Sequence, residues 1–463
     1  MKIVMKFGGT SVGDGKRIRH VAELLKSYFD KGNQVIMVTS ALAGVTDGLL
    51  ETATAACEYG KVATISEFIA ALKLKHFNAV NDAIENKKIR AEVIEHLEIK
   101  IDELEKALIG ICYLGELTSR SKDNISSYGE RLAAPIVSGA IRSLKIPSKY
   151  YTGGEAGVIT TDVFGGAKPL PKSYALIHER LTPEFKSSIQ VVTGFIGENE
   201  DGNITTLGRS GSDYTASIIG VGVKADEIWL WKEVDGIMTT NPKIVPDAQT
   251  IKFISYQEAM ELSSLGAEVL HPRAIEPSMQ HHIPVRVKST FKPDFDGTLV
   301  ISENKMSKNV VKAVSMIKKI ALINISSVEM VGSVGKVAKI FSILADKNVN
   351  VRLISQGSES SISFIVNEND RVKTVKAIKA ELGDSYNVEF RADVAVVAVV
   401  GAGMAGTPGV ARRVFTALGK ENINIIMISQ GSSEYNISCV VNIDDVNKAV
   451  LALHNEFELG KKE

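Results

Sequence analysis

The sequence predicts an α/β protein with a mostly parallel sheet, followed by two smaller units of βαββαβ type. The first observation is a series of short apolar strands that end in glycine- and hydroxyl-rich turns and lead into helices, up to about residue 301. The second is an internal repeat, in which residues 339–358 match residues 413–432. Alternating strands and helices favour a parallel sheet, and each repeat copy reads as strand, helix, two strands, helix and strand.

The composition is that of a globular chain with more than one domain. A length of 463 residues favours two or three domains. Lys plus Arg and Asp plus Glu both number 54, so the net charge is zero and a broad nucleic-acid or anionic-membrane surface is not expected. No signal peptide is expected at the first residues, and the longest apolar run, at 394–404, is too short for a membrane span.

Three cysteines, Cys57, Cys112 and Cys439, lie far apart without a metal-binding or disulfide pattern. We therefore expect no disulfide framework and no zinc site, and a reducing cytoplasm suits the chain.

The first strand is expected at Ile3–Phe7, and it ends in Gly8-Gly9-Thr10-Ser11. A helix from about Gly15 to Phe29 would direct its N-terminus at this turn, and such places attract anions, phosphates above all. The lysine precedes the glycines, so the turn is not a Walker A loop. An ordinary strand-to-helix turn explains this stretch equally well.

The next strand, 34–38, ends in a second small and hydroxyl-rich turn at 39–47, which contains Ser40 and Thr46. In an open parallel sheet, ligands bind at the carboxyl ends of the strands. Both turns should therefore face one crevice.

A Lys- and Glu-rich helical region at 62–112 has no evident chemistry, because its charges suit a solvated surface. Another helix carries Tyr128-Gly129-Glu130-Arg131, and we expect Glu130 and Arg131 at its start or in its first turns. An exposed ion pair would explain these two residues without a functional role.

Residues 188–197 read as a strand that enters a glycine turn, and 205–214 form another hydroxyl-rich turn with Arg209 and Asp213, followed by an apolar helix at 215–221. A strand at 227–231 then leads into a polar loop at 232–242. His271, before Pro272, could act as a base, but a structural role is favoured. His281 and His282 read as surface residues without metal ligands nearby.

One motif is misleading. Residues 401–406 spell G-x-G-x-x-G after a strand and before a helix. A dinucleotide site would need an acidic residue at the end of the next strand, 423–428, and none is there, because Glu421 precedes the strand. The same position of the first copy reads Val328-Glu329-Met330-Val331-Gly332, so this is a turn of the repeat.

Taken together, the segments resemble the monofunctional aspartate kinases of the amino-acid-kinase superfamily with tandem ACT domains. The resemblance covers the whole chain and rests on motifs that occur in one order: Lys6–Ser11, Ser40-Ala41 with Val45-Thr46, Tyr128–Arg131, Thr205–Tyr214, Val269–Pro272 and the two Ser-Gln-Gly-Ser turns.

The resemblance implies an αβα-sandwich kinase domain at 1–301, a linker and first ACT domain at 302–388, and a second ACT domain at 389–463, whose sheet the segment near 302–315 would complete. The implied enzyme is a phosphotransferase that moves the γ-phosphoryl group of ATP to L-aspartate, at the start of lysine, threonine and methionine biosynthesis. The acceptor carboxylate is already ionised, so positioning and charge neutralisation suffice. Alternatives are another carboxylate kinase or a catalytically weak amino-acid sensor.

The resemblance also assigns roles. Lys6 and Asp213 would be catalytic, and Asp213 would organise Mg²⁺ indirectly, because ATP phosphates mainly hold the metal. Aspartate would bind Ser40, Thr46, Glu130, Arg209 and Ser212. The nucleotide and its phosphates would contact Lys6, Gly8, Gly9, Thr10, Ser11, Gly211, Ser212, Lys232, Glu233, Met238 and Lys243. An effector would be read by Gln356, Ser358, Gln430 and Asn436.

Departures from the family pattern gather in the nucleotide half. Lys232-Glu233 stand where Thr-Asp is usual, Met238 where Tyr is frequent, and Asn241-Pro242-Lys243 where Asp-Pro-Arg is frequent. Glu268 replaces a common lysine, which removes a phosphate cation, and Ser210 replaces a frequent glycine. Nucleotide preference could therefore differ from ATP.

The ACT pair implies feedback control by an end-product amino acid, and the Ser-Gln-Gly-Ser turns favour threonine over lysine. Such modules usually pair across a two-fold axis, so a homodimer or higher oligomer is expected. Neither nucleic acid nor membrane is an expected partner.

Overall fold

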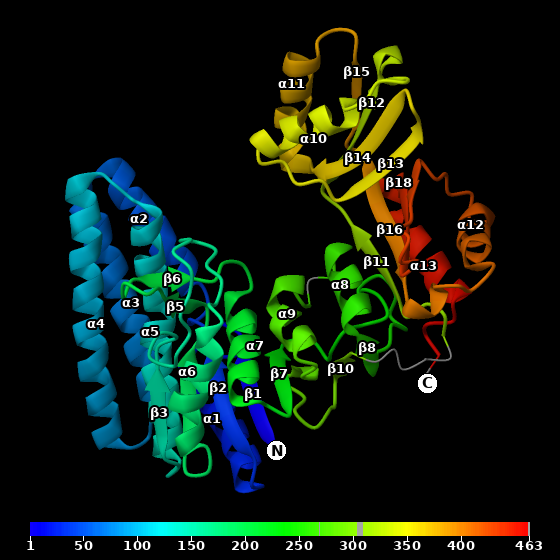
Figure 1. Cartoon of the computed structure of the whole chain (residues 1–463). Coiled ribbons are helices and arrows are strands. Elements are labelled where there is room, and N and C mark those ends of the chain that lie inside the picture. Colours follow the sequence, from blue (N-terminus) through cyan, green and yellow to red (C-terminus); the bar gives the residue numbers. More distant parts are fainter. Residues whose placement is uncertain (268, 303–308, 462–463) are drawn as a thin grey trace. The chain divides into compact units, whose positions relative to one another are not determined.

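The computed structural model describes residues 1–267, 269–302 and 309–461 (Figure 1). The chain divides into two compact units, Met1–Ile237 with His271–Ser302, and Met238–Leu270 with Glu303–Glu463. The expected linker at 302–310 falls largely outside the described residues. All three cysteines are free, and no helix in the described ranges is long and apolar enough to cross a membrane.

The first unit is built on a mostly parallel sheet with the strand order β3-β4-β2-β1-β7-β9-β10. The strands β1, β2, β3, β4, β7 and β9 pair in parallel, and β10 is antiparallel to β9. Their bounds are β1 Lys2–Phe7, β2 Gln34–Thr39, β3 Ser148–Tyr151, β4 Ile189–Thr193, β7 Glu227–Lys232, β9 Val285–Ser289 and β10 Thr298–Ile301. This sheet confirms the predicted α/β class.

Helices cover both faces of this sheet (Figure 1). On β1, Ile3, Met5 and Phe7 belong to the core that α1 and α5 complete, whereas Lys6 points to the opposite face, because side chains alternate along a strand. Helix α7 packs against β1, β2 and β7, and its neighbours are α6 and α9. The helices are α1 Gly15–Asp30, α5 Ser119–Ser143, α6 Lys172–Leu181, α7 Gly211–Val223 and α9 Pro272–Gln280.

The helical region expected at 62–112 forms two helices, α3 (Val62–Ala83) and α4 (Lys87–Leu114), which pack with α2 (Val45–Tyr59). The chain turns at 84–86, and the Asn86 side chain accepts hydrogen bonds from the backbone N–H groups of Lys88 and Ile89. A side-chain cap of this kind starts a new helix without glycine or proline.

Beyond the large sheet, β5 (Ile196–Glu198) and β6 (Ile204–Thr206) form a two-stranded antiparallel ribbon.

The second unit contains two four-stranded antiparallel sheets of the same design. The first repeat domain has the order β13-β14-β12-β15, and the second has β17-β18-β16-β11. The first repeat domain comprises β12 Ile320–Ser326, α10 Lys336–Asp346, β13 Leu353–Ser358, β14 Ser361–Asn367, α11 Arg371–Leu382 and β15 Asn387–Arg391. The second comprises β11 Ala313–Ile317, β16 Val394–Val400, α12 Val410–Lys420, β17 Met427–Ser429, β18 Asn436–Asn442 and α13 Val446–Glu456.

Strand β11, which precedes the first repeat domain in sequence, pairs along β16 of the second. The first repeat domain is therefore inserted between the first and second strands of the second. The first glycine of the misleading motif has a packing role, since a Cβ at Gly401 would lie 2.4 Å from the carbonyl oxygen of Val310, whereas a Cβ at Gly406 would meet nothing within 4 Å.

The two Ser-Gln-Gly-Ser segments adjoin each other, and the first, Ser355–Ser358, is part of strand β13 and not the expected turn. Strand β13 contacts β17, and Ser429 Oγ donates a hydrogen bond of 3.1 Å to the Ile354 carbonyl oxygen. The repeat domains thus meet at β13, which contains the first Ser-Gln-Gly-Ser segment, and at β17, which leads into the second.

Helix α8 (Tyr256–Ser264), which follows the short strand β8 (Phe253–Ser255), packs on β16 of the second repeat domain. Glu258 on α8 is fully buried, and its carboxylate lies 2.8 Å from Lys312 Nζ and accepts a 2.7 Å hydrogen bond from Ala402 N. A buried charge is tolerated when it is paired and hydrogen-bonded, as it is here.

Candidate active site

A cavity of about 740 Å³ opens at the carboxyl ends of the central strands of the first unit. A volume of this size suits small-molecule ligands, and the position is the one expected for an open parallel sheet. The structure brings ten of the predicted residues to its wall: Lys6, Gly9, Ser40, Thr46, Glu130, Arg209, Gly211, Ser212, Asp213 and Lys232.

Two lysines share one carboxylate in this cavity. Lys6 Nζ lies 2.6 Å from Asp213 Oδ1, and Lys232 Nζ lies 2.9 Å from Asp213 Oδ2. Burial disfavours ionisation of Asp213, but the two ammonium groups outweigh it, so the pKa of this carboxyl lies below its usual range. Burial lowers the pKa of Lys6, and Asp213 opposes that effect. The cluster holds two positive charges and one negative charge.

Helix α7 begins at this cluster. Gly211, Ser212 and Asp213 form its first turn, so its unpaired N–H groups and the positive end of its dipole lie at the cavity wall. Ser210, just before the helix, has a φ of 57°. This left-handed conformation strains residues other than glycine, so a glycine would fit this position with less strain.

Glu130 is buried, which excludes the alternative that it forms an exposed ion pair with Arg131. Its Oε1 accepts a 3.1 Å hydrogen bond from Ala41 N, and its Oε2 has no hydrogen-bond partner among the described residues. Burial raises the pKa of the Glu130 carboxyl to about 8. Gly129 permits its helix to lie close to Ala41, because a Cβ on residue 129 would be only 2.7 Å from the Cβ of Ala41.

The expected position of Glu130 in its helix was wrong. Helix α5 begins at Ser119, about three turns earlier, so Glu130 and Arg131 lie in its middle. Thr118 caps the helix by accepting from Ser121 N, and this start was missed because the polar residues 118–124 lack an apolar period. Arg131 stacks on Tyr128, with its guanidinium carbon 4.2 Å from the ring centroid.

Arg209 is exposed, and no carboxylate in the described ranges pairs with its guanidinium group. Ser40 and Thr46 come from the turn after β2. The cavity therefore has one end with Lys6, Lys232 and the α7 N-terminus, and further walls with a buried carboxyl and a free guanidinium group.

Gly8, Thr10, Ser11 and Glu233 are not among the residues that line the cavity. A Cβ at Gly8 would lie 3.6 Å from Lys6 Nζ, so the lysine side chain passes over the glycine turn. Ser11 is buried, and its hydroxyl hydrogen-bonds to that of Thr290 at 2.9 Å. Glu233 is exposed.

The remaining predicted nucleotide residues, Met238 and Lys243, belong to the second unit. Thr250 Oγ1 donates to Met238 Sδ at 3.4 Å, and Lys243 is exposed. Their role stays a prediction.

The predicted effector residues belong to the repeat domains. Gln356 and Ser358 lie on β13, Gln430 follows β17, and Asn436 begins β18. The Asn436 side chain donates a 2.6 Å hydrogen bond to Glu261 of α8. Asn436 therefore contacts the segment that precedes the repeat domains in sequence.

Sequence reasoning missed Asp123, another buried wall residue. Its carboxylate accepts hydrogen bonds from Gly165 N, Thr206 N and Thr206 Oγ1, and so ties α5 to β6 and to the loop at 163–167. No motif marked it, because its partners, two backbone N–H groups and the Thr206 hydroxyl, are brought close to it only by folding.

The histidines have structural or surface positions. His271 caps α9 by accepting from Arg273 N at 3.3 Å, which agrees with the favoured structural role, and His281 and His282 are exposed. The described residues contain no cluster of three or more His, Cys, Asp or Glu side chains that could hold a metal.

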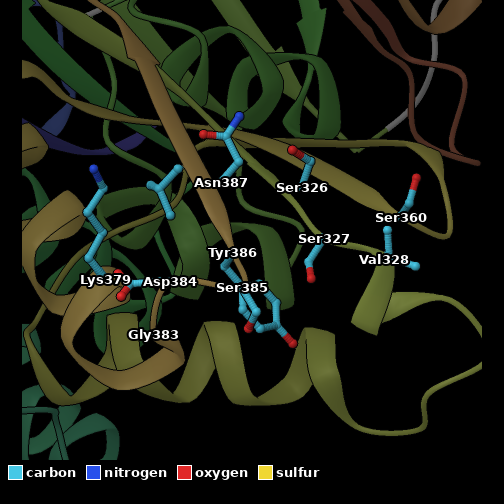
Figure 2. A pocket seen from close by; sticks show the side chains of 11 residues that line it. Ser326, Ser327, Val328, Ser360, Lys379, Gly383, Asp384, Ser385, Tyr386 and Asn387 are labelled. Atoms are coloured by element: carbon cyan, nitrogen blue, oxygen red, sulfur yellow. The ribbon is translucent and has the colours of Figure 1, made fainter.

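A second cavity, of about 600 Å³, lies in the first repeat domain (Figure 2). It is lined by Ser326 and Ser327, by the turn residue Ser360, by Lys379 of α11 and by the segment 383–388. Neither Gln356 nor Ser358 is part of its wall, so this cavity and the predicted effector residues are different parts of one domain.

Known protein families and proteins match both parts of the chain. Residues 1–289 match the amino acid kinase family, and residues 323–382 and 397–457 match the ACT domain. Aspartokinase 2 of Bacillus subtilis is 32% identical over 466 residues, a match that covers 99% of this chain and 98% of that protein. The chloroplastic aspartokinase 1 of Arabidopsis thaliana is 33% identical, with 98% of this chain and 80% of that protein covered. The chain belongs to the aspartokinases.

Solved aspartokinase structures share the fold. Escherichia coli aspartokinase III in complex with aspartate and ADP has a TM-score of 0.80 at 29% identity, and the match covers 99% of this chain and 100% of that one. The same aspartokinase in complex with lysine and aspartate has a TM-score of 0.83 at 28% identity, covering 98% and 99%. These matches confirm the predicted architecture of a kinase domain followed by two ACT domains.

Proposed function

We propose that this aspartokinase transfers the γ-phosphoryl group of ATP to the side-chain carboxylate of L-aspartate and releases 4-phospho-L-aspartate and ADP. The observation that carries the proposal is the single cavity in which Lys6, Asp213 and Lys232 share a wall with Glu130 and Arg209. One end of this cavity suits phosphates, and the other groups suit a free amino acid.

The aspartate would be held by opposite charges at its two α-substituents. Arg209 offers two parallel N–H donors to the α-carboxylate, and Glu130 offers its unpartnered Oε2 to the ammonium group. Ser40, Thr46 and Ser212 add hydroxyl groups. These contacts would direct the side-chain carboxylate to the end of the cavity with Lys6.

A carboxylate oxygen of aspartate then attacks the γ-phosphorus. One P–O bond forms, the P–O bond to the β-phosphate breaks, and no proton is transferred. Lys6 would neutralise charge on the phosphoryl oxygens, and the α7 N-terminus and the Gly8-Gly9 turn would supply backbone N–H donors. Positioning and electrostatics thus account for the reaction.

Mg²⁺ would be carried mainly by the ATP phosphate oxygens and would neutralise their charge. The cavity fits this arrangement, because Asp213 already pairs with two ammonium groups and would take part indirectly. The further nucleotide contacts of this proposal are Gly8, Thr10, Ser11, Glu233, Met238 and Lys243.

The ACT domains would provide feedback control, with threonine as the favoured effector. The residues that bind it would be Gln356, Ser358, Gln430 and Asn436. A lysine complex is known for the Escherichia coli enzyme. We propose the cytoplasm as the location and a homodimer or higher oligomer, formed through the ACT domains, as the assembly.

A hydroxamate assay tests the reaction directly. Purified protein with ATP, Mg²⁺ and hydroxylamine should yield aspartyl hydroxamate from L-aspartate, and little from L-glutamate or N-acetyl-L-glutamate. Product from either of the latter two, and none from aspartate, would show that the chain is a different carboxylate kinase. Omission of Mg²⁺ should abolish the signal.

A further inference from the structure

Lys232 lies on the same side of the sheet as Lys6. In the parallel pair of β1 and β7, Lys6 is the register partner of Leu230, and Lys232 follows Leu230 by two residues. Because side chains alternate along a strand, Lys232 and Lys6 point to one face, where α7 presents Asp213. The resemblance placed Lys232 among the contacts to the nucleotide and its phosphates, and it did not name Lys232 as a catalytic residue.

Asp213 binds each lysine with a different oxygen, so it holds both ammonium groups in fixed positions. The three side chains are well shielded, with exposed fractions of 10% for Lys6, 22% for Lys232 and 6% for Asp213. Lys232 is the most accessible of the three, and it remains part of the cavity wall.

The cluster has one uncompensated positive charge. Lys232 contributes to lowering the pKa of Lys6, which indicates that the two cations repel each other despite the shared carboxylate. Glu130 does not cancel the excess near neutral pH, because its pKa is raised to about 8. An anion placed between the two lysines would relieve this repulsion.

We propose that Lys232 is a second catalytic cation, which binds an oxygen of the transferring phosphoryl group opposite Lys6, while Asp213 holds both lysines in place. This inference rests on the proposed function. It assigns to Lys232 a contact with the reacting group. Lys232 on β7 would then supply the cation that the glutamate at sequence position 268 does not offer.

The test compares Lys232→Met and Lys232→Arg in the full chain. Lys232→Met should lower kcat about 10²–10³-fold, because one preorganised charge at the transition state is lost, and the KM for aspartate should stay within about threefold. Lys232→Arg, which keeps the charge, should recover part of kcat. The control Lys26→Met removes the lysine of a surface ion pair with Asp30 and should stay within about twofold.

Calorimetry of nucleotide binding separates phosphate contact from a purely structural role. Wild type should bind a non-hydrolysable ATP analogue more tightly than ADP, and Lys232→Met should reduce that preference about tenfold or more, with AMP binding unchanged. Equal weakening of all three nucleotides, or a kcat within threefold of wild type in a folded Lys232→Met protein, would overturn the inference.

The two proposals fail differently. If wild type forms no aspartyl hydroxamate, the proposed function fails, whereas the dependence of the nucleotide preference on Lys232 still decides the inference. Circular dichroism of each variant establishes that it is folded.

Discussion

The ammonium group of Lys6 lies 2.6 Å from a carboxylate oxygen of Asp213, which joins the end of β1 to the first turn of α7. Both side chains are buried, so this pair belongs to the cavity wall and is not a surface ion pair. The same carboxylate also fixes Lys232, which makes Asp213 the centre of the phosphate end of the site.

Lys6→Met and Asp213→Asn should each lower kcat by about 10²-fold or more. The first removes a charge aimed at the phosphoryl group, and the second frees two lysines from the carboxylate that orients them. The hydroxamate assay measures both, with Lys26→Met as a control. Turnover near that of wild type in either variant would contradict the assigned roles.

Aspartate affinity should depend on pH through Glu130. Free Glu130 has a pKa of about 8, so it is mostly protonated at pH 7, and it must ionise to bind an ammonium group. The Kd for aspartate should therefore fall as pH rises from about 6.5 to 8, by up to about tenfold per pH unit, and about one proton should be released on binding at pH 7. Titration calorimetry in buffers of different ionisation enthalpy measures both quantities.

Glu130→Gln is the matched control for this effect. It should weaken aspartate binding, flatten its pH dependence and abolish the proton release. An unchanged pH profile in this variant would show that another group titrates.

Ser210→Gly should stabilise the first unit by roughly 0.5–1 kcal/mol, because glycine adopts the left-handed conformation of this residue without a Cβ clash. Urea unfolding followed by tryptophan fluorescence is specific for this unit, since both tryptophans, Trp229 and Trp231, lie on β7. Ser210→Ala provides the comparison and should bring no gain. Equal stability of all three proteins would argue against strain at this residue.

The buried pair of Glu258 and Lys312 should be important for the second unit. Lys312→Met leaves a fully buried carboxylate without its cation and should destabilise this unit by about 3–5 kcal/mol. The double variant Lys312→Met with Glu258→Gln should be less destabilised, because no buried charge remains. Thermal unfolding by circular dichroism measures both, and a loss under 1 kcal/mol for Lys312→Met would show that water reaches the pair.

Threonine should inhibit the reaction, and Gln356→Ala or Gln430→Ala should raise the threonine concentration needed, about tenfold. The amide of one of these residues would hydrogen-bond the effector, and β17 adjoins β13 through the hydrogen bond from Ser429 to Ile354. The kcat without effector should remain as in wild type. Inhibition by lysine but not by threonine would refute the effector assignment.

The predicted fold agrees with the structure where the sequence pattern is local. The strands at 2–7, 34–39, 189–193 and 227–232 and the helix α1 follow from apolar runs and glycine turns. The start of α5 was missed, since a polar cap followed by polar residues carries no helical period. The break between α3 and α4 needed the Asn86 cap, which spacing alone does not reveal.

The sequence by itself determined the class of the protein, the repeat and most residues of the candidate site. Motifs such as Lys6–Ser11 and Thr205–Tyr214 are contiguous, because a turn and the helix after it are encoded locally. Only the tertiary structure decided that Lys232 shares Asp213 with Lys6, that Glu130 is buried against Ala41, and that Asp123 ties two distant segments. Each of these depends on strand order and helix packing, which bring together charges and backbone groups that are far apart in the chain.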